Sequence, residues 1–283
     1  MNDVVTPGPV PQASATSSSD AAKGVRQHKG ARVIAVTSGK GGVGKTFVSA
    51  NVAAALAKRG LRVLVLDADL GLANLDVVLN LYPKITLHDV FTGKAKLEDA
   101  VIQAPGGFSV LLAGSGLVEY SRLTPEVRDD FLKVLHSLTP QFDVVILDTG
   151  AGISDVVLYA VSLADEVLVV ATPEPTSLTD AYATIKVLSS QQKRQVIRVV
   201  INQANAPGDG RQIVTQLQNV VDRFVGAQSG IQLKLAHVGD IPADQSVRQA
   251  VQRRQLMLLA YPGCAAAIAV QHIAARLQDL LPR

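Results

Sequence analysis

The sequence predicts a doubly wound α/β fold, in which a mostly parallel sheet carries helices on both faces. Short apolar runs rich in β-branched residues alternate with helix-forming stretches along most of the chain, a pattern typical of parallel strands joined by crossover helices. A glycine-rich loop separates the first such run from the first helix-forming stretch. With 283 residues, 48% of them hydrophobic, the chain can bury a sizeable core. The predicted strands lie near residues 32–38, 61–67, 108–113, 142–148, 166–172, 196–202 and 233–238.

The glycine-rich loop fits the phosphate-binding pattern G-x-x-x-x-G-K-[ST]. It lies between the apolar run 32–38 and a helix-forming stretch that starts at Phe47, which is the context that such a loop requires. The pattern predicts that backbone N–H groups hold phosphate oxygens, that Lys45 reaches the β- and γ-phosphates, and that the Thr46 hydroxyl reaches Mg²⁺. The predicted nucleotide-binding residues of this segment are Gly39, Lys40, Gly41, Gly42, Val43, Gly44, Lys45, Thr46 and Phe47.

Acidic residues follow two other predicted strands. Asp67 and Asp69 come at the end of one apolar run, and Asp148 ends the run 142–148. The carboxyl ends of parallel strands meet at one edge of a doubly wound sheet, so we expect these acids beside the phosphate loop. Apolar residues before an acid such as Asp148 are typical of the group that holds Mg²⁺ through water. Each acid taken alone could instead cap a helix, which is the commoner role of an aspartate after a strand.

The segment K-G-G-V-G-K-T, with a second lysine at Lys40, resembles the deviant phosphate loop of the MinD/ParA family of ATPases. The resemblance covers about residues 32–281 and implies an ATP-dependent homodimer, in which Lys40 reaches the nucleotide of the partner subunit. The competing interpretation of Lys40 is a solvated loop cation. The stretch D-A-D-L-G-L-A-N, which starts at Asp67, resembles the switch I segment of this family. By that resemblance Asp69 positions the attacking water, and Asp67 supports the Mg²⁺ and phosphate environment.

Two later segments complete the expected nucleotide pocket. The strand 196–202 ends in Asn202, and in the resembled family an asparagine at this place bonds the adenine edge, which suits an amide with both donor and acceptor. The segment V-G-D-I-P-A-D resembles the family's loop against the base, where Pro242 fixes the backbone. Asp244 could belong to that contact or cap the helix expected over residues 245–254, and both interpretations stay open.

Composition limits the other function classes. The single cysteine, Cys264, allows no internal disulfide and no paired-cysteine cluster, which favours a reducing compartment. No apolar run approaches the roughly 18 residues of a membrane span, and the chain does not start like a signal peptide, so we expect a cytoplasmic protein. The net charge of +3 is slight and aromatic residues make up only 4%. Without a basic stripe interleaved with stacking residues, nucleic acid is not an expected partner.

Residues 1–31 differ in composition from the rest, because proline, serine and small polar residues leave almost nothing that can pack. We expect a disordered tail here and an ATPase domain at 32–283. The segment from Asp20 to Arg26 resembles the D-Q-A-x-x-L-R element of flagellar-number ATPases of the FlhG/FleN type, which activates a flagellar GTPase of the signal-recognition-particle class. Ala21 and Val25 depart from that element, so the implied activation would be weaker. A chance match is the alternative.

The last predicted helix, from Cys264 to Leu281, has one apolar face. Val270, Ile273 and Leu277 recur on it at three- and four-residue spacing. In the resembled family a C-terminal amphipathic helix binds the membrane in the ATP state, but such helices carry basic residues along the polar face. This one carries only Arg276. We therefore expect it to pack against the sheet, with a transient membrane contact as the alternative.

Taken together, the motifs predict an enzyme that binds and hydrolyses ATP with Mg²⁺ and uses this cycle as a dimerisation switch. The resemblance implies that the switch controls the position or number of flagella. Two alternatives are a ParA-type ATPase that partitions DNA or plasmids and a MinD-type ATPase that determines the septum site. The candidate catalytic residues are Lys40, Lys45, Asp67 and Asp69, and the candidate metal ligands are Thr46, Asp67 and Asp148.

Overall fold

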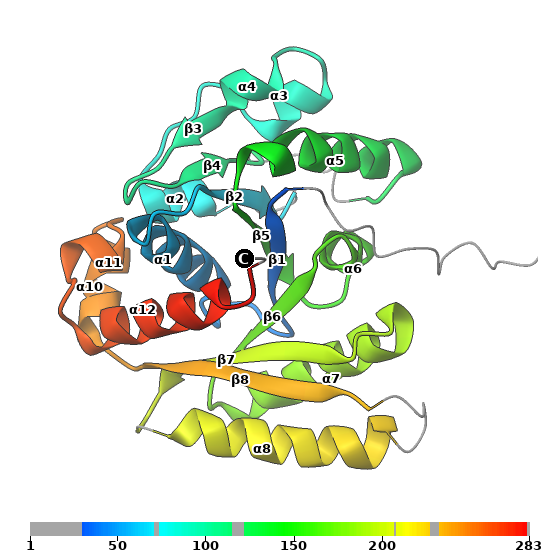
Figure 1. Cartoon of the computed structure of the whole chain (residues 1–283), viewed down its shortest axis with the longest axis vertical. Helices are drawn as coiled ribbons and strands as arrows, with labels where there is room; N and C mark the ends of the chain where they lie inside the picture. Colours follow the sequence, from blue (N-terminus) through cyan, green and yellow to red (C-terminus); the bar gives the residue numbers. More distant parts are fainter. Residues whose placement is uncertain (1–29, 71–73, 115–121, 207, 227–231, 282–283) are drawn as a thin grey trace, which may run out of the picture.

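An eight-stranded sheet in the order β3-β4-β2-β5-β1-β6-β7-β8 forms the centre of the molecule (Figure 1). The structure is a computed structural model that describes residues 30–70, 74–114, 122–206, 208–226 and 232–281. Neighbouring strands run parallel except for the edge pair β3 and β4, which is antiparallel. The strands are β1 (Arg32–Ser38), β2 (Val63–Ala68), β3 (Val101–Gln103), β4 (Ser109–Leu111), β5 (Val144–Ala151), β6 (Glu166–Ala171), β7 (Val196–Ala204) and β8 (Lys234–Pro242).

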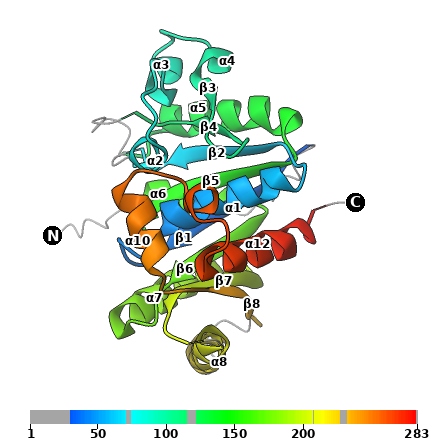
Figure 2. The same cartoon turned by 90° about the vertical axis from the view of Figure 1, so that its left-hand side faces the viewer.

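Helices cover both faces of this sheet (Figure 2). One face packs against α1 (Lys45–Lys58), α2 (Leu75–Leu79), α10 (Gln245–Gln252), α11 (Met257–Ala260) and α12 (Ala265–Gln278). The other packs against α3 (Leu87–Phe91), α4 (Leu97–Ala100), α5 (Pro125–Leu138), α6 (Asp155–Ser162), α7 (Pro175–Gln192) and α8 (Asp209–Val221). The doubly wound, mostly parallel fold expected from the sequence is therefore confirmed.

The strands at the centre of the sheet explain why the apolar runs in the sequence are continuous. Every residue of β2 and β6 is buried, and β1 is buried after its first residue, because both faces of these strands are covered. All seven predicted strands occur. The eighth strand, β3, was not predicted, since it has only three residues, all at least partly exposed, at the edge of the sheet.

The candidate site lies at the carboxyl edge of this sheet because of the strand order. The phosphate loop leaves β1, which lies between β5 and β6, and β2 lies on the other side of β5. The register pairs Asp67 of β2 directly with Asp148 of β5. Two acids that are 81 positions apart in the chain thus occupy neighbouring places beside the loop.

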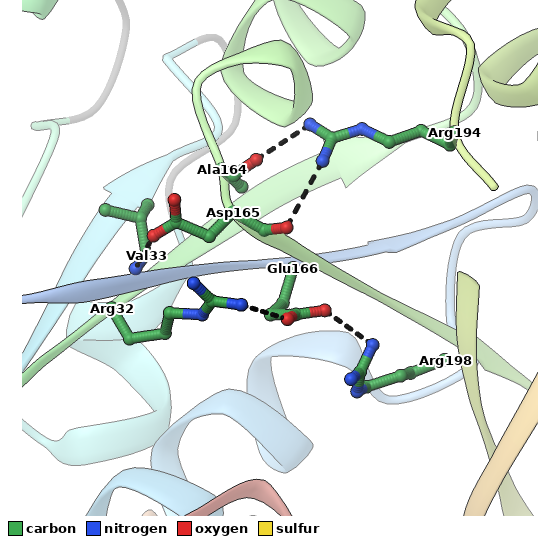
Figure 3. A network of polar contacts seen from close by, with 7 residues as sticks. All are labelled: Arg32, Val33, Ala164, Asp165, Glu166, Arg194 and Arg198. Carbon is green, nitrogen blue, oxygen red and sulfur yellow. Dashed lines mark hydrogen bonds and ion pairs between the residues drawn. The ribbon is translucent and has the colours of Figure 1, made fainter. Parts of the chain in front are cut away.

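A network of charged side chains joins the strands at the opposite, amino edge of the sheet (Figure 3). Glu166, the first residue of β6, accepts hydrogen bonds from Arg32 of β1 and Arg198 of β7, each over 2.5 Å. Arg194 donates to three backbone carbonyls around the end of α6. These contacts tie β1, β6 and β7 together far from the phosphate loop, so they stabilise the register without occupying the site.

The C-terminal helix α12 packs against the sheet, as expected. Val270, Ile273 and Leu277 are almost fully buried against α1 and β8, so these apolar residues face the core. None of the described helices has the length and apolar character needed to cross a membrane. Residues 1–29 of the expected tail, with the element from Asp20 to Arg26, lie outside the described residues, whereas Ala31 is buried in the core and donates to the carbonyl of Thr139 over 2.8 Å.

Candidate functional site

A cavity of about 870 Å³ opens at the carboxyl edge of the sheet. Its walls come from the phosphate loop after β1, the ends of β2, β5, β7 and β8, the start of α6, and one side of α10. Ligands of doubly wound sheets bind at this edge, and the volume is typical of a small-molecule site. The cavity therefore brings together segments that the sequence singled out separately.

The phosphate loop is shaped by glycine at two positions. Gly42 and Gly44 have φ values of 79° and 94°, a left-handed backbone that other residues adopt only with strain. Gly44 is also the N-cap of α1, whose first turn carries no acidic side chain. The free N–H groups and the positive end of the helix dipole therefore remain available to an anion.

Most loop residues predicted to bind nucleotide line the cavity. They are Gly41, Gly42, Gly44, Lys45, Thr46 and Phe47. The side chain of Val43 is instead buried in the core beside α1. Gly39 also lies away from the cavity and packs so closely on the backbone of α7, at Asp180 and Ala181, that no Cβ could fit there.

Asn202, at the end of β7, supports the phosphate loop. Its Nδ2 donates a hydrogen bond to the carbonyl of Val43 over 2.8 Å, and its amide fills the space that a Cβ on Gly44 would need. Asn202 also lines the cavity. This contact uses one of the two Nδ2 hydrogens, so the acceptor Oδ1 and the second N–H remain for a ligand.

The two paired acids, Asp67 and Asp148, are deeply buried beside the phosphate loop. Burial raises the pKa of Asp148 to about 6, although hydrogen bonds from Ser49 and Thr46 and the charge of Lys45 oppose the shift. Burial, followed by the charge of Asp148, raises the pKa of Asp67 well above its usual value. The Asp67 Oδ2 is buried without a hydrogen-bond partner. A nearby cation would stabilise the charged form of both carboxylates.

Lys45 and Asp69 are charged neighbours of Asp148, and Asp69 also neighbours Asp67. Burial lowers the pKa of Lys45, while the charges of Asp148 and Asp69 act in the opposite direction. The carboxylate of Asp69 lies against Gly150, where a Cβ would be 3.3 Å from its atoms. Asp69 is thus held next to Gly150 near the end of β5, and it lines the same cavity as the phosphate loop.

This donor set fits a Mg²⁺ ion that is shared with a phosphate ligand. Among the described residues, His, Cys, Asp and Glu side chains form no group that could hold a metal alone. Mg²⁺ keeps several waters and takes one or two carboxylates together with substrate phosphates. Thr46, Asp148 and the unpaired oxygen of Asp67 could supply that partial set, since all three lie at the cavity.

Lys40 does not line the cavity. Its Nζ bonds Glu174 Oε2 over 3.1 Å and Thr176 Oγ1 over 2.9 Å, at the start of α7. Both the lysine and the glutamate are exposed, so the contact is weak and can be exchanged. Within one subunit, the second lysine of the loop therefore points toward α7 rather than toward a phosphate in its own cavity.

Asp244 caps helices. Its Oδ1 accepts from the N–H of Ser246 in α10 over 2.8 Å, and its Oδ2 accepts from Ala266 in α12 over 3.2 Å. Asp244 therefore caps α10, as one of the two interpretations predicted, and its second hydrogen bond links α10 to α12. Asp244 and Pro242 also line the cavity, so their contact with a base stays a prediction.

Several residues at this site were missed by sequence reasoning, and three of them illustrate why. Ser49 bonds Asp148, and Val247 and Arg248 of α10 line the cavity. Ser49 could have been found, because it lies three positions after Thr46 and thus one helical turn further along α1. No sequence motif marks Val247 and Arg248 as site residues, because their position at the cavity depends on how α10 packs.

Comparison with protein families matches residues 31–201 to a model described as an AAA domain. The chain is 44% identical to the antiactivator FleN of Pseudomonas aeruginosa over 248 residues, covering 88% of this chain and 86% of that protein. It is 34% identical to the flagellum site-determining protein YlxH of Helicobacter pylori, covering 80% of this chain and 74% of that protein.

A solved structure has the same fold. The septum site-determining protein MinD from Pyrococcus horikoshii, complexed with Mg-ADP, aligns with a TM-score of 0.69 and 27% identity. The alignment covers 88% of this chain and 97% of that chain. The similarity therefore extends over most of this chain and nearly all of that one.

Proposed function

The chain belongs to the MinD/ParA family of P-loop ATPases, and on that premise we propose that it is an ATP-dependent dimerisation switch that sets the number or position of flagella. The observation that carries this proposal is the 44% identity to FleN over 88% of the chain. Similarity to YlxH, a second flagellar protein, supports it. No feature of the described residues favours the DNA-partitioning or septum-site alternatives.

The cavity is proposed to bind ATP with Mg²⁺. The N–H groups of the phosphate loop and Lys45 hold the β- and γ-phosphates. Thr46 and Asp148 hold the metal, the latter through water, with Asp67 supporting them. A bound Mg²⁺ neutralises charge that develops on the transferred phosphoryl group. Support comes from the two buried carboxylates, whose pKa values burial raises. A Mg²⁺ ion beside them would stabilise their charged form.

Hydrolysis is proposed to depend on Asp69. Its carboxylate lies against Gly150 in the cavity that the phosphate loop also lines, where it can orient a water molecule toward the γ-phosphate. Lys45, from the same cavity, stabilises negative charge on the phosphoryl oxygens as water adds to the γ-phosphorus and ADP leaves. The products are ADP and phosphate.

Asn202 is proposed to select the base. One Nδ2 hydrogen is donated to Val43, and the acceptor Oδ1 is proposed to face the base, where it suits the amino group of adenine and disfavours the carbonyl oxygen at the same place in guanine. Pro242 borders the same end of the cavity, and Asp244 keeps that loop in place through its two helix caps.

Dimerisation is proposed to use Lys40. An ATP molecule bound in one subunit offers negative charge that a lysine from a second subunit can neutralise, which couples association to the γ-phosphate. The Lys40 side chain is partly exposed, and its contacts with Glu174 and Thr176 are surface contacts. Exchanging them for the partner's phosphate costs little.

Residues 1–31 are proposed to be a tail that acts on a partner, with the ATPase domain at 32–283. The partner would be a flagellar GTPase of the signal-recognition-particle class, and the contact would use the segment from Asp20 to Arg26. The protein would work in the cytoplasm. A membrane contact through α12 is not part of the proposal, because the apolar face of that helix is packed in the core.

The flagellar role can be tested by deleting the gene in its host and counting flagella per cell by electron microscopy. We expect the number or position of flagella to change, the wild-type gene to restore it, and a Lys45→Ala gene to fail, since it removes the lysine of the phosphate loop. Unchanged flagella with altered plasmid retention or septum placement would instead favour one of the two alternatives.

A further inference from the structure

Ser49 of α1 is a fully buried serine whose hydroxyl makes one specific contact. Its Oγ donates a hydrogen bond to Oδ1 of Asp148 over 2.8 Å. Both side chains are buried, so the contact is shielded from water and cannot be replaced by a solvent molecule without opening the core.

The fold explains why these two groups meet. Along β5, Val144 and Ile146 point into the core cluster beneath α1. Side chains on a strand alternate between faces, so Asp148 continues that same face and ends under α1. Ser49 lies one turn beyond Thr46 on this helix, and the side chain of Thr46 also bonds Asp148. Asp148 therefore sits between two hydroxyl donors from consecutive turns.

We propose that Ser49 is a positioning residue for the metal site: its hydroxyl fixes one oxygen of the Asp148 carboxylate to α1 and so aims the other toward the water shell of a bound Mg²⁺. The inference rests on the proposed function, since it assumes a nucleotide site that uses Mg²⁺. It adds a residue that touches neither the metal nor the nucleotide.

The two hydroxyls have different tasks. Thr46 lines the cavity and Ser49 does not, so only Thr46 can turn toward a metal. When it does, Ser49 is the donor that continues to hold Asp148. Such partners of metal ligands fix ligand orientation, and their loss typically lowers metal affinity or activity by about 10- to 100-fold. The hydrogen bond from Ser49 also opposes the rise in the pKa of Asp148 that burial causes.

Removal of this hydroxyl has a specific expected signature. In Ser49→Ala, Asp148 keeps its place in β5 but loses the donor that fixes its carboxylate. The amide cradle of the phosphate loop, Lys45 and Asn202 remain unchanged. Nucleotide binding without metal should therefore persist, whereas the dependence on Mg²⁺ should change.

The chain offers a matched control. Ser189 of α7 is another fully buried serine, and its hydroxyl has no hydrogen-bond partner. Ser189→Ala removes the same atom from an equally buried helical position away from the cavity. Ser49→Thr keeps a hydroxyl at the site. If Ser49→Ala does not fold, Ser49→Cys replaces the hydroxyl by a weak donor of similar size and provides the same comparison.

The experiment measures binding of a fluorescent ADP first in EDTA and then during a Mg²⁺ titration, for the full chain and its variants. We expect Ser49→Ala to bind in EDTA like wild type but to need about tenfold more Mg²⁺ for half-maximal effect. Ser189→Ala should match wild type, and Ser49→Thr should recover most of the affinity. The Mg²⁺-dependent rise in the melting temperature of the ADP complex should follow the same order.

A Mg²⁺ midpoint for Ser49→Ala within twofold of wild type would overturn the positioning role. Equal loss of binding in EDTA and in Mg²⁺ would also overturn it, since it would show a structural role for the serine. If the wild-type protein itself bound ADP without any response to Mg²⁺, or did not bind ADP, the proposed function would fail first. The wild-type titration thus separates the two failures.

Discussion

Replacing Asn202 by alanine tests two roles of one amide. In the structure its Nδ2 donates to the carbonyl of Val43 over 2.8 Å, which supports the phosphate loop. In the proposed function its Oδ1 accepts from the amino group of adenine. Asn202→Ala removes both, so we expect a loss of stability together with a loss of preference for ATP over GTP.

The size of each effect follows from the surroundings of Asn202. Removing a partner from a buried hydrogen bond costs about 1–3 kcal/mol. Asn202 lines the cavity, so water can replace its amide at the Val43 carbonyl, and we expect the lower end, about 1 kcal/mol. Losing one neutral hydrogen bond to the base costs about as much, which reduces the ATP preference by roughly five- to tenfold.

Asn51 provides a control for general damage. It is also a buried asparagine and belongs to α1 itself. It bonds the carbonyl of Phe47 and the N–H of Leu258, each over 2.9 Å, and does not line the cavity. With two bonds and no access to water, Asn51→Ala should cost more stability than Asn202→Ala, about 2–3 kcal/mol. Its ATP preference should be unchanged.

Urea unfolding gives the free energies of unfolding of Asn202→Ala and Asn51→Ala relative to wild type. Displacement of a fluorescent nucleotide by ATP or by GTP gives the preference of each protein for ATP. The reasoning would be refuted by an Asn202→Ala protein that keeps the wild-type ratio of ATP to GTP affinity. It would also be refuted if Asn51→Ala lost that ratio to the same extent, because the effect would then come from a disturbed loop and not from the base contact.

Three further expectations concern the acids and the tail. Because burial raises the pKa of Asp148 from 3.8 to about 6, the folded protein without ligand binds a proton more tightly than the unfolded chain does. The stability that this carboxyl contributes is thus present below pH 4 and lost as the pH rises through 6, by about 3 kcal/mol. Asp148→Asn should therefore resist urea better than wild type at pH 7 but not at pH 4, and an equal difference at both values would contradict this. Asp69→Ala should bind ATP and dimerise yet release phosphate slowly, and unchanged turnover would move the water-positioning role elsewhere. A peptide spanning Asp20 to Arg26 should raise the hydrolysis rate of the partner GTPase, while deletion of residues 1–31 leaves ATP hydrolysis intact. No effect of the peptide at saturation would remove the tail from the proposal.

Sequence reasoning located the segments of the site but not how their side chains meet. The phosphate loop, the acids and Asn202 could be found because each follows a recognisable apolar strand. The direct pairing of Asp67 with Asp148 could not, since it depends on the register between β2 and β5. Strand register is set by packing across the sheet, and the sequence of either strand alone leaves it open.

Two residues make contacts that the sequence did not predict for them. Lys40 bonds Glu174, a contact across 134 positions that only the packing of α7 on the phosphate loop creates. Asn202 bonds the phosphate loop as well as facing the cavity, because the strand order places the end of β7 near that loop. Asp244, by contrast, caps α10 as its place before a helix predicted.

The dimerisation switch is tested most directly by sedimentation of the purified protein with Mg²⁺ and a slowly hydrolysed ATP analogue, compared with ADP. Wild type should double its mass with the ATP analogue and stay monomeric with ADP. Lys45→Ala should bind neither nucleotide, while Lys40→Ala should bind the analogue and remain a monomer, because one lysine acts within the subunit and the other across the interface. A wild-type protein with the same mass in both nucleotides, or a Lys40→Ala protein that dimerises like wild type, would contradict the account.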